Sequence, residues 1–163
     1  MSRLNSGLFT SNRDDWETPD SLFQALNSEF GFTLDVCANP TNHKSDNYFD
    51  PSNDGLSQSW QWNICWMNPP YGREIGKWVA KARKEADEGG SIVVCLLPAR
   101  TDTAWFHDYI YGRAEIRFLR GRVRFVGAPY GAPFPSMICI FHPKFDVEDV
   151  SSTVKQKVMD SGK

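Results

Sequence analysis

The sequence predicts one α/β domain, an open sheet with helices on its faces. Short apolar runs of strand length alternate with amphipathic helical patterns, which is typical of this fold class. Several strand-like runs follow one another near the C-terminus, which indicates an antiparallel edge. The 163 residues are enough for one domain with its own core, but too few for a catalytic domain with a large separate recognition domain.

The first predicted helix has a clear beginning and end. Thr18 and Pro19 are typical of an N-cap and a first helical residue. Leucine and phenylalanine then recur at helical spacing until Gly31, which favours a stop. We therefore expect a helix over residues 19–30.

The remaining elements follow from apolar runs and turn residues. Buried strands are predicted where short apolar stretches lie between polar or helix-breaking residues, at 32–37, 62–67, 91–97, 114–119, 123–126 and 136–141. Amphipathic spacing from Ile75 to Ala86 predicts a second helix that Gly89-Gly90 closes, and a short helix is expected over 103–110. Residues 39–59 are rich in Asn, Asp, Ser and Pro, which predicts an ordered loop with room for a short strand at 48–49.

Composition excludes several classes of protein. Hydrophobic residues make up 40% and charged residues 23%, which argues against a membrane protein and against a disordered chain. The first 30 residues contain no apolar run of signal-peptide or membrane-span length, so we expect a cytoplasmic protein. The four cysteines lie singly in apolar stretches, and neither they nor the three histidines have metal-ligand spacing. We therefore expect reduced core thiols, no bound metal and no membrane partner.

The tetrapeptide Asn68-Pro69-Pro70-Tyr71 directly follows a predicted strand and fits the needs of methyl transfer to an amino group on an aromatic ring. Such an amine is a poor nucleophile, because its lone pair is delocalised into the ring. The Asn68 carboxamide oxygen and the Pro69 carbonyl could each accept one N–H and favour a localised lone pair. The prolines stiffen the loop, and Tyr71 could stack on an extruded base. A plain strand-to-helix turn is the alternative.

The sequence resembles the phage-type Dam family of DNA N6-adenine methyltransferases over residues 15–143. Several motifs occur in the family's order, which is more specific than any one of them. They are D-W-E-T-P (15–19), L-D-V-C-A (34–38), D-G-L with a following Trp (54–60), N-P-P-Y-G (68–72), L-L-P-A-R-T (96–101), W-F-H (105–107) and G-R-V-R-F (121–125).

The resemblance implies the fold of a class I methyltransferase, which has a Rossmann-like sheet. It also implies that the protein uses S-adenosyl-L-methionine to methylate a flipped-out adenine in double-stranded DNA. It also implies a bacterial or phage-infected cell as the setting. The chain departs from larger adenine methyltransferases, because no glycine-rich F-x-G-x-G follows the first strand and only 32 residues separate Asp35 from Asn68. We therefore expect a sheet that is abbreviated in its middle.

Carried over residue by residue, the resemblance predicts that seven residues contact the cofactor. They are Trp16, Thr18, Pro19, Asp35, Cys37, Asp54 and Leu56. Asp35 would accept hydrogen bonds at the methionine or ribose end, although a buried aspartate that caps a neighbouring loop is an alternative. Thr18 and Pro19 could simply begin a helix, and Asp54 and Leu56 could form a solvated turn.

A local basic patch is the candidate DNA-binding surface, because the formal net charge of −2 gives no global attraction to phosphates. Five arginines lie within twelve residues and only Glu115 opposes them: Arg113, Arg117, Arg120, Arg122 and Arg124. Arg122 and Arg124 share one face of an extended segment, which suits phosphate contact. A charged edge that discourages sheet aggregation is the alternative.

Two other hypotheses about function are compatible with the sequence. A class I methyltransferase could use the same tetrapeptide on cytosine N4, guanine N2 of RNA or a protein glutamine. A nucleic-acid-binding relative could have kept the fold and lost activity, although intact Asn68 and Tyr71 argue against this. We expect an N-terminal arm at 1–14, a methyltransferase domain at 15–143 and a polar tail at 144–163.

Overall fold

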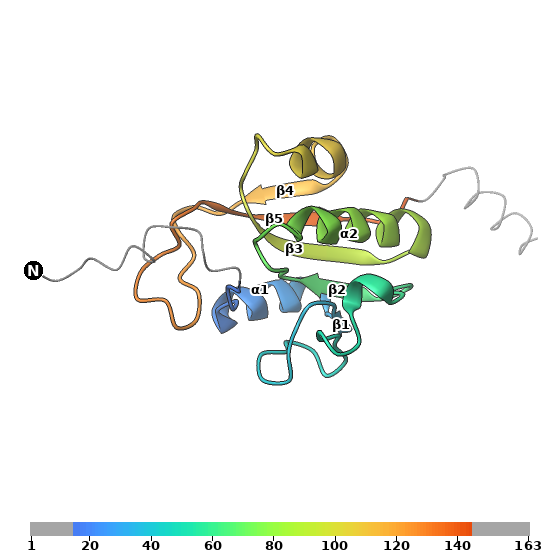
Figure 1. The fold of residues 1–163 in the computed structure, drawn as a ribbon, viewed down its shortest axis with the longest axis horizontal. Coiled ribbons are helices and arrows are strands. Elements are labelled where there is room, and N and C mark those ends of the chain that lie inside the picture. Colours follow the sequence, from blue (N-terminus) through green and yellow to red (C-terminus); the bar gives the residue numbers. More distant parts are fainter. Residues whose placement is uncertain (1–14, 145–163) are drawn as a thin grey trace, which may run out of the picture.

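The computed structural model describes residues 15–144, which form a mixed five-stranded sheet in the order β1-β2-β3-β5-β4 (Figure 1). The strands are β1 (Leu34–Asp35), β2 (Ile64–Met67), β3 (Ile92–Pro98), β4 (Glu115–Phe118) and β5 (Ser136–Phe141). Strands β1, β2 and β3 are parallel, whereas β5 is antiparallel to both β3 and β4. The expected α/β architecture is confirmed, with the reversed strand second from the edge. The predicted arm at 1–14 and the tail beyond 144 lie outside the described residues.

Two helices cover the sheet, α1 (Asp20–Phe30) and α2 (Ile75–Gly89). Phe23 of α1 packs edge-on against Trp66 of β2, with 5.5 Å between ring centroids. Burial and, after it, the negative charge of Glu85 in α2 raise the pKa of the adjacent Cys65 thiol, so Cys65 lies on the side of β2 that faces α2. Because successive strand residues point to opposite faces, α1 and α2 cover opposite faces of the sheet. The short helices η2 (Gly55–Ser57) and η3 (Phe106–Ile110) complete the fold.

The ends of both helices and the position of β5 agree closely with the predictions from the sequence. Gly31 adopts a φ of 69° and Gly90 a φ of 68°, the left-handed conformation that terminates a helix at little cost for glycine. Strand β5 spans the predicted residues 136–141, and all six are buried. The strong apolar run of β3 pairs with it from Val93 to Pro98, so these two strands form the centre of the core.

Several local predictions were wrong. The strand predicted at 62–67 begins at Ile64, because Trp62 has a φ of 63° and its side chain is 75% exposed. The strand predicted at 32–37 is only β1, and the one at 48–49 is a single bridge from Tyr48 to β1. Pro19, not Thr18, is the N-cap of α1, and no side chain caps that helix.

The predicted strand at 123–126 is loop, although its alternating pattern is real. Arg122 and Arg124 are exposed and Phe125 is buried. The backbone there bonds to no strand, since Val126 N donates to Glu17 O in the segment before α1 and Val123 O accepts from Ala132 N within the same loop. The alternation of exposed and buried side chains is therefore present without a strand.

The D-G-L motif and its following tryptophan hold the loop after β1 against the core. A Cβ added at Gly55 would lie 2.2 Å from Val36 O, so only glycine fits this approach. Trp60 is fully buried, and its Nε1 donates to Gly55 O at 2.9 Å. Asp54 accepts from Leu56 N and caps η2.

Gly55→Ala is therefore expected to lower the free energy of unfolding by about 2 kcal/mol or more, because backbone must move to relieve the clash. Urea unfolding measures it. Gly76→Ala in α2 is the matched control, since its Cβ would meet nothing closer than 3.6 Å and alanine favours the helix. Equal effects of the two substitutions would contradict this packing.

Candidate active site

The candidate site lies where the parallel strands end. Asp35 ends β1, Asn68 follows β2 and Arg100 lies just beyond β3, and the strand register brings these ends together. Open α/β sheets bind ligands at this edge, outside the carboxyl ends of their strands. A cavity of about 320 Å³ opens there. Its lining includes Trp16, Thr18, Asp35, Cys37, Lys44 and Asn68.

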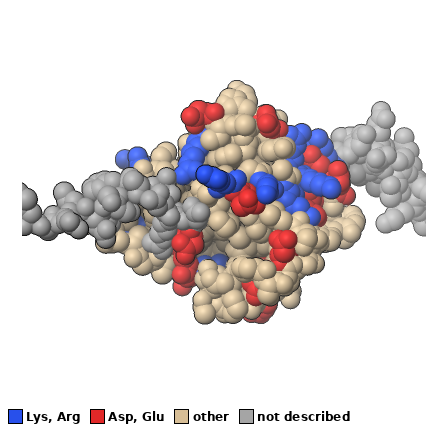
Figure 2. Space-filling model, viewed as in Figure 1, with Lys and Arg blue, Asp and Glu red and all other residues tan. Residues whose placement is uncertain are grey.

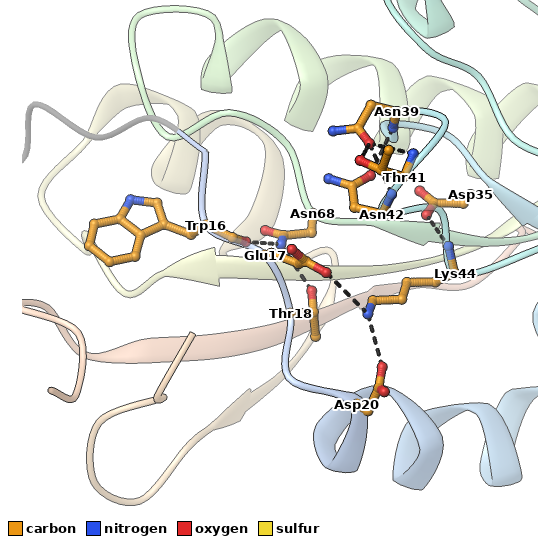
Figure 3. Close-up of polar contacts among 10 residues, drawn as sticks. All are labelled: Trp16, Glu17, Thr18, Asp20, Asp35, Asn39, Thr41, Asn42, Lys44 and Asn68. Atoms are coloured by element: carbon orange, nitrogen blue, oxygen red, sulfur yellow. Dashed lines mark hydrogen bonds and ion pairs between the residues drawn. The ribbon is translucent and has the colours of Figure 1, made fainter. Parts of the chain in front are cut away.

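The Asn68 side chain is held in one orientation by the segment before α1 (Figure 3). Its Nδ2 donates to Trp16 O at 2.5 Å and to Thr18 Oγ1 at 2.9 Å. A backbone carbonyl can only accept, so the amide nitrogen must face Trp16. This leaves Asn68 Oδ1 buried and without a hydrogen-bond partner among residues 15–144. Buried polar atoms are rarely left unsatisfied, so this oxygen is a candidate acceptor for a substrate N–H.

Thr18 does not cap α1, although its place before Pro19 in the sequence favours an N-cap. Its side chain is buried, and its hydroxyl accepts from Asn68 instead of capping α1. The neighbouring Pro19 caps α1 and does not line the cavity. The segment before α1 thus links the cavity wall to the Asn-Pro-Pro-Tyr loop.

Asp35 organises the loop that follows β1. Its Oδ1 accepts from Cys37 N at 3.3 Å and its Oδ2 from Lys44 N at 2.9 Å. Burial raises the pKa of the Asp35 carboxyl, and these two amide hydrogen bonds act in the opposite direction. Asp35 therefore caps a loop, as the alternative for it proposed, and it also lines the cavity, while its contact with the cofactor stays a prediction.

A polar loop at 39–44 forms one cavity wall that sequence reasoning left unassigned. Asn39 Oδ1 accepts from Thr41 N and Asn42 N at 2.9 Å, and Asn42 Oδ1 accepts from Asn39 N at 2.8 Å. Asn residues favour such side-chain-stabilised turns, which is the signal that could have predicted this wall. The loop occupies the position after β1 where a glycine-rich turn was missing from the sequence.

Lys44 is the basic residue of this cavity, and it was also missed. Its Nζ lies 3.0 Å from Asp20 Oδ1 and 4.0 Å from Glu17 Oε1 (Figure 3).

Arg100, within the L-L-P-A-R-T motif, donates to Tyr71 O at 3.4 Å. A basic residue at the end of a buried strand was the available signal for Arg100.

Tyr71 is packed inside the protein. Its side chain is 3% exposed, its hydroxyl donates to Leu96 O at 2.9 Å, and its ring lies edge-on against Phe125 and Phe134. Burial holds the pKa of this hydroxyl well above its ordinary value, so it stays a donor. A base can reach the Tyr71 ring only if the two phenylalanines move.

The other predicted cofactor residues divide into two groups. Trp16 and Cys37 line the cavity, and burial beside Asp35 raises the pKa of the Cys37 thiol to about 12, so the thiol is protonated at neutral pH. Asp54 and Leu56 do not line it. All four cysteines are free, as expected from their isolated positions.

The arginine patch is divided by ion pairs. Arg113 pairs with Asp87, and Arg117 pairs with Glu29 and Glu115. Basic side chains over α2 also have acidic neighbours, which Figure 2 shows as mixed blue and red. Three arginines of the patch are exposed and make no ion pair with residues 15–144: Arg120, Arg122 and Arg124.

Residues 15–144 contain neither a candidate metal site nor a candidate membrane span. Across residues 15–144 no group of three or more His, Cys, Asp or Glu side chains is placed to hold a metal ion. Over the same range no helix has the length and apolarity to cross a membrane.

Comparison with known proteins identifies the family. The sequence model of DNA N-6-adenine-methyltransferase (Dam) matches residues 5–163. A DNA N-6-adenine-methyltransferase of Haemophilus phage HP1 is 32% identical over 142 residues, covering 82% of each chain. Another, of Escherichia phage T1, is 33% identical over 106 residues, covering 64% of this chain and 44% of its own length. The expected resemblance is confirmed, and the chain belongs to the DNA N-6-adenine-methyltransferase (Dam) family.

Proposed function

We propose that this protein methylates the N6 amine of adenine in double-stranded DNA, with S-adenosyl-L-methionine as the methyl donor. Membership of the Dam family supports the reaction. The observation that carries the residue assignment is the unpartnered, buried Asn68 Oδ1 at the end of β2, beside the cavity. An acceptor fixed in this way suits an amino group better than a carbonyl or a hydrocarbon.

Asn68 and Pro69 act as acceptors for the two N–H bonds of the flipped-out adenine. Accepting hydrogen bonds from these N–H groups favours a lone pair localised on N6 and stabilises the positive charge that develops there. Trp16 O and Thr18 Oγ1 hold the carboxamide before substrate arrives, so little reorganisation accompanies the reaction. Pro69 and Pro70 stiffen the loop, and Tyr71 supports it through Leu96 O.

The cavity fits the proposed cofactor by position and charge. When bound, S-adenosyl-L-methionine supplies an electrophilic methyl group on a positively charged sulfonium. Acidic side chains of Asp15, Glu17 and Asp35 line the cavity beside Lys44, which suits a ligand with cationic groups and one carboxylate. We assign Trp16, Thr18 and Cys37 to the same wall. Contacts by Pro19, Asp54 and Leu56 stay predictions.

We further infer that the sheet is an abbreviated class I methyltransferase sheet. This inference is supported by the parallel order β1-β2-β3, by the helix α2 that connects β2 to β3, and by the cavity at the carboxyl edge of these strands. The segment from Asp35 to Asn68 contains η2 and no strand other than β2. Loop 39–44, held by Asp35, stands in for the glycine-rich turn.

Transfer of a radiolabelled methyl group tests this proposal against its alternatives. Purified protein is given labelled cofactor with duplex DNA, RNA or a glutamine-containing protein, and we expect label in DNA alone. Label in RNA or protein instead of DNA would favour another N-methyltransferase. Cofactor binding without any transfer would favour an inactive nucleic-acid-binding relative.

Asp35→Ala is expected to weaken binding of S-adenosyl-L-methionine by about tenfold or more, since it releases two amide hydrogen bonds to a buried carboxylate and removes a negative charge from the cavity. Calorimetric titration measures the affinity. Asp46→Ala is the matched control, because Asp46 is exposed and does not line this cavity. Unchanged affinity in a folded Asp35→Ala protein would remove Asp35 from the cofactor site.

Thr18→Val is expected to lower kcat by about tenfold through Asn68, because valine keeps the shape but cannot accept from Nδ2. Thr18→Ser keeps the hydroxyl and should restore most of the rate. In an Asn68→Ala background, Thr18→Val should have no further effect on kcat if it acts through Asn68. An additive loss would show that Thr18 acts elsewhere.

A further inference from the structure

The loop at 119–135 lies at the same end of the sheet as Asn68. It connects β4 to β5, and Phe118 pairs with Met137 while Pro98 at the end of β3 pairs with Ser136. Figure 1 shows the loop projecting beyond the sheet. Because β2 runs parallel to β3, the loop and the Asn-Pro-Pro-Tyr segment emerge from one edge.

The base of this loop is fixed to the active site. Phe125 and Phe134 are buried, and both pack on Trp16 with ring centroids 5.2 and 5.3 Å apart. The same two rings cover Tyr71. The loop therefore packs directly on Trp16, which lines the cavity.

The outer part of the loop is a closed turn with a basic rim. Ala132 N donates to Val123 O at 2.8 Å, which closes the turn. Arg122 donates to Ala132 O at 3.3 Å and Arg124 to Pro129 O at 2.8 Å. These bonds hold the arginines along the loop while their side chains stay exposed.

Tyr130 lies on this turn and presents an unburied ring. Its side chain is 72% exposed, and it makes no hydrogen bond or aromatic contact with residues 15–144. Tyr111 is similarly exposed at 69%, but its ring lies against Phe106 at 6.1 Å. An exposed aromatic ring beside arginines is the combination that binds phosphates and stacks on bases.

We propose that Tyr130 enters the DNA duplex and stacks in the space that the extruded adenine leaves. The proposal rests on adenine methylation at Asn68. Flipping a base removes its stacking and pairing, a cost of a few kcal/mol. A ring inserted between the neighbouring bases recovers stacking and prevents the adenine from returning, while Arg122 and Arg124 hold the adjacent phosphates.

Two duplexes in which flipping the adenine has different costs distinguish insertion of Tyr130 from a purely structural role of this residue. Two duplexes are prepared around an adenine that the wild-type protein methylates, one with its normal thymine partner and one with an abasic site opposite. On the paired duplex, Tyr130→Ala should lower the single-turnover rate by about tenfold or more. Opposite the abasic site the adenine flips easily, so the variant should approach the wild-type rate.

Matched variants and an optical readout complete the test. Tyr130→Phe keeps the ring and should remain active, and Tyr111→Ala should match wild type on both duplexes. With 2-aminopurine at the target position, Tyr130→Ala should show a smaller rise in fluorescence on binding. An equal loss on both duplexes, or no loss on the paired one, would overturn the insertion. Inactivity of the wild-type protein on all adenine duplexes would instead overturn the proposed function.

Discussion

Asn68→Ala is expected to lower the rate of methyl transfer about a hundredfold or more while cofactor binding stays nearly unchanged. The substitution removes a preorganised acceptor at the atom where charge develops, and such groups have effects of this size. Single-turnover kinetics with saturating DNA and S-adenosyl-L-methionine measure the chemical step directly. Calorimetric titration of the same variant measures the cofactor affinity.

A matched asparagine makes this result specific. Asn63 precedes β2 as Asn68 follows it, and its side chain donates to Trp60 O away from the cavity. Asn63→Ala should therefore keep the wild-type rate. Near-normal turnover in Asn68→Ala would remove the carboxamide from the chemistry, and loss of cofactor binding would reassign Asn68 to the cofactor site.

Replacing Arg122 and Arg124 with alanine is expected to weaken DNA binding by about 30-fold at 0.15 M salt, for two phosphate contacts. The loss should be similar across unrelated sequences, because phosphate contacts carry no base information. Binding measured at several salt concentrations should give a slope of log K against log salt that is smaller by about 1.8.

The control for this pair removes the same charge elsewhere. Lys77 and Lys84 are exposed on α2, among acidic neighbours. Their double alanine variant changes the net charge equally but should leave the salt slope close to that of wild type. Equal slopes in all three proteins would favour the alternative in which Arg122 and Arg124 form a solvent-exposed charged edge without contacting phosphates.

The sequence predicted those features whose causes are local. Helix α2 has a strong amphipathic period and a glycine at its end, and β5 is an apolar run after its first residue, Ser136. The Asn68 loop was located correctly because two prolines end the strand before it. Each of these signals lies within the element that it specifies.

Features that depend on distant contacts were not predictable in this way. Thr18 meets Asn68 across 50 positions, and Arg113 meets Asp87 across 26, so the role of each depends on the fold. The segment 123–126 has strand-like alternation but lies where no strand can pair with it. Tertiary packing overrode local preference at each position.

Identification of the methylated nucleoside tests the central claim most directly. DNA treated with the purified protein and S-adenosyl-L-methionine is digested to nucleosides and examined by mass spectrometry, with Asn68→Ala as the matched control. We expect N6-methyladenine from the wild-type protein and its near absence with the variant. N4-methylcytosine, or no methylated nucleoside with wild-type protein, would contradict the assignment of adenine N6 as the acceptor and Asn68 as the residue that binds it.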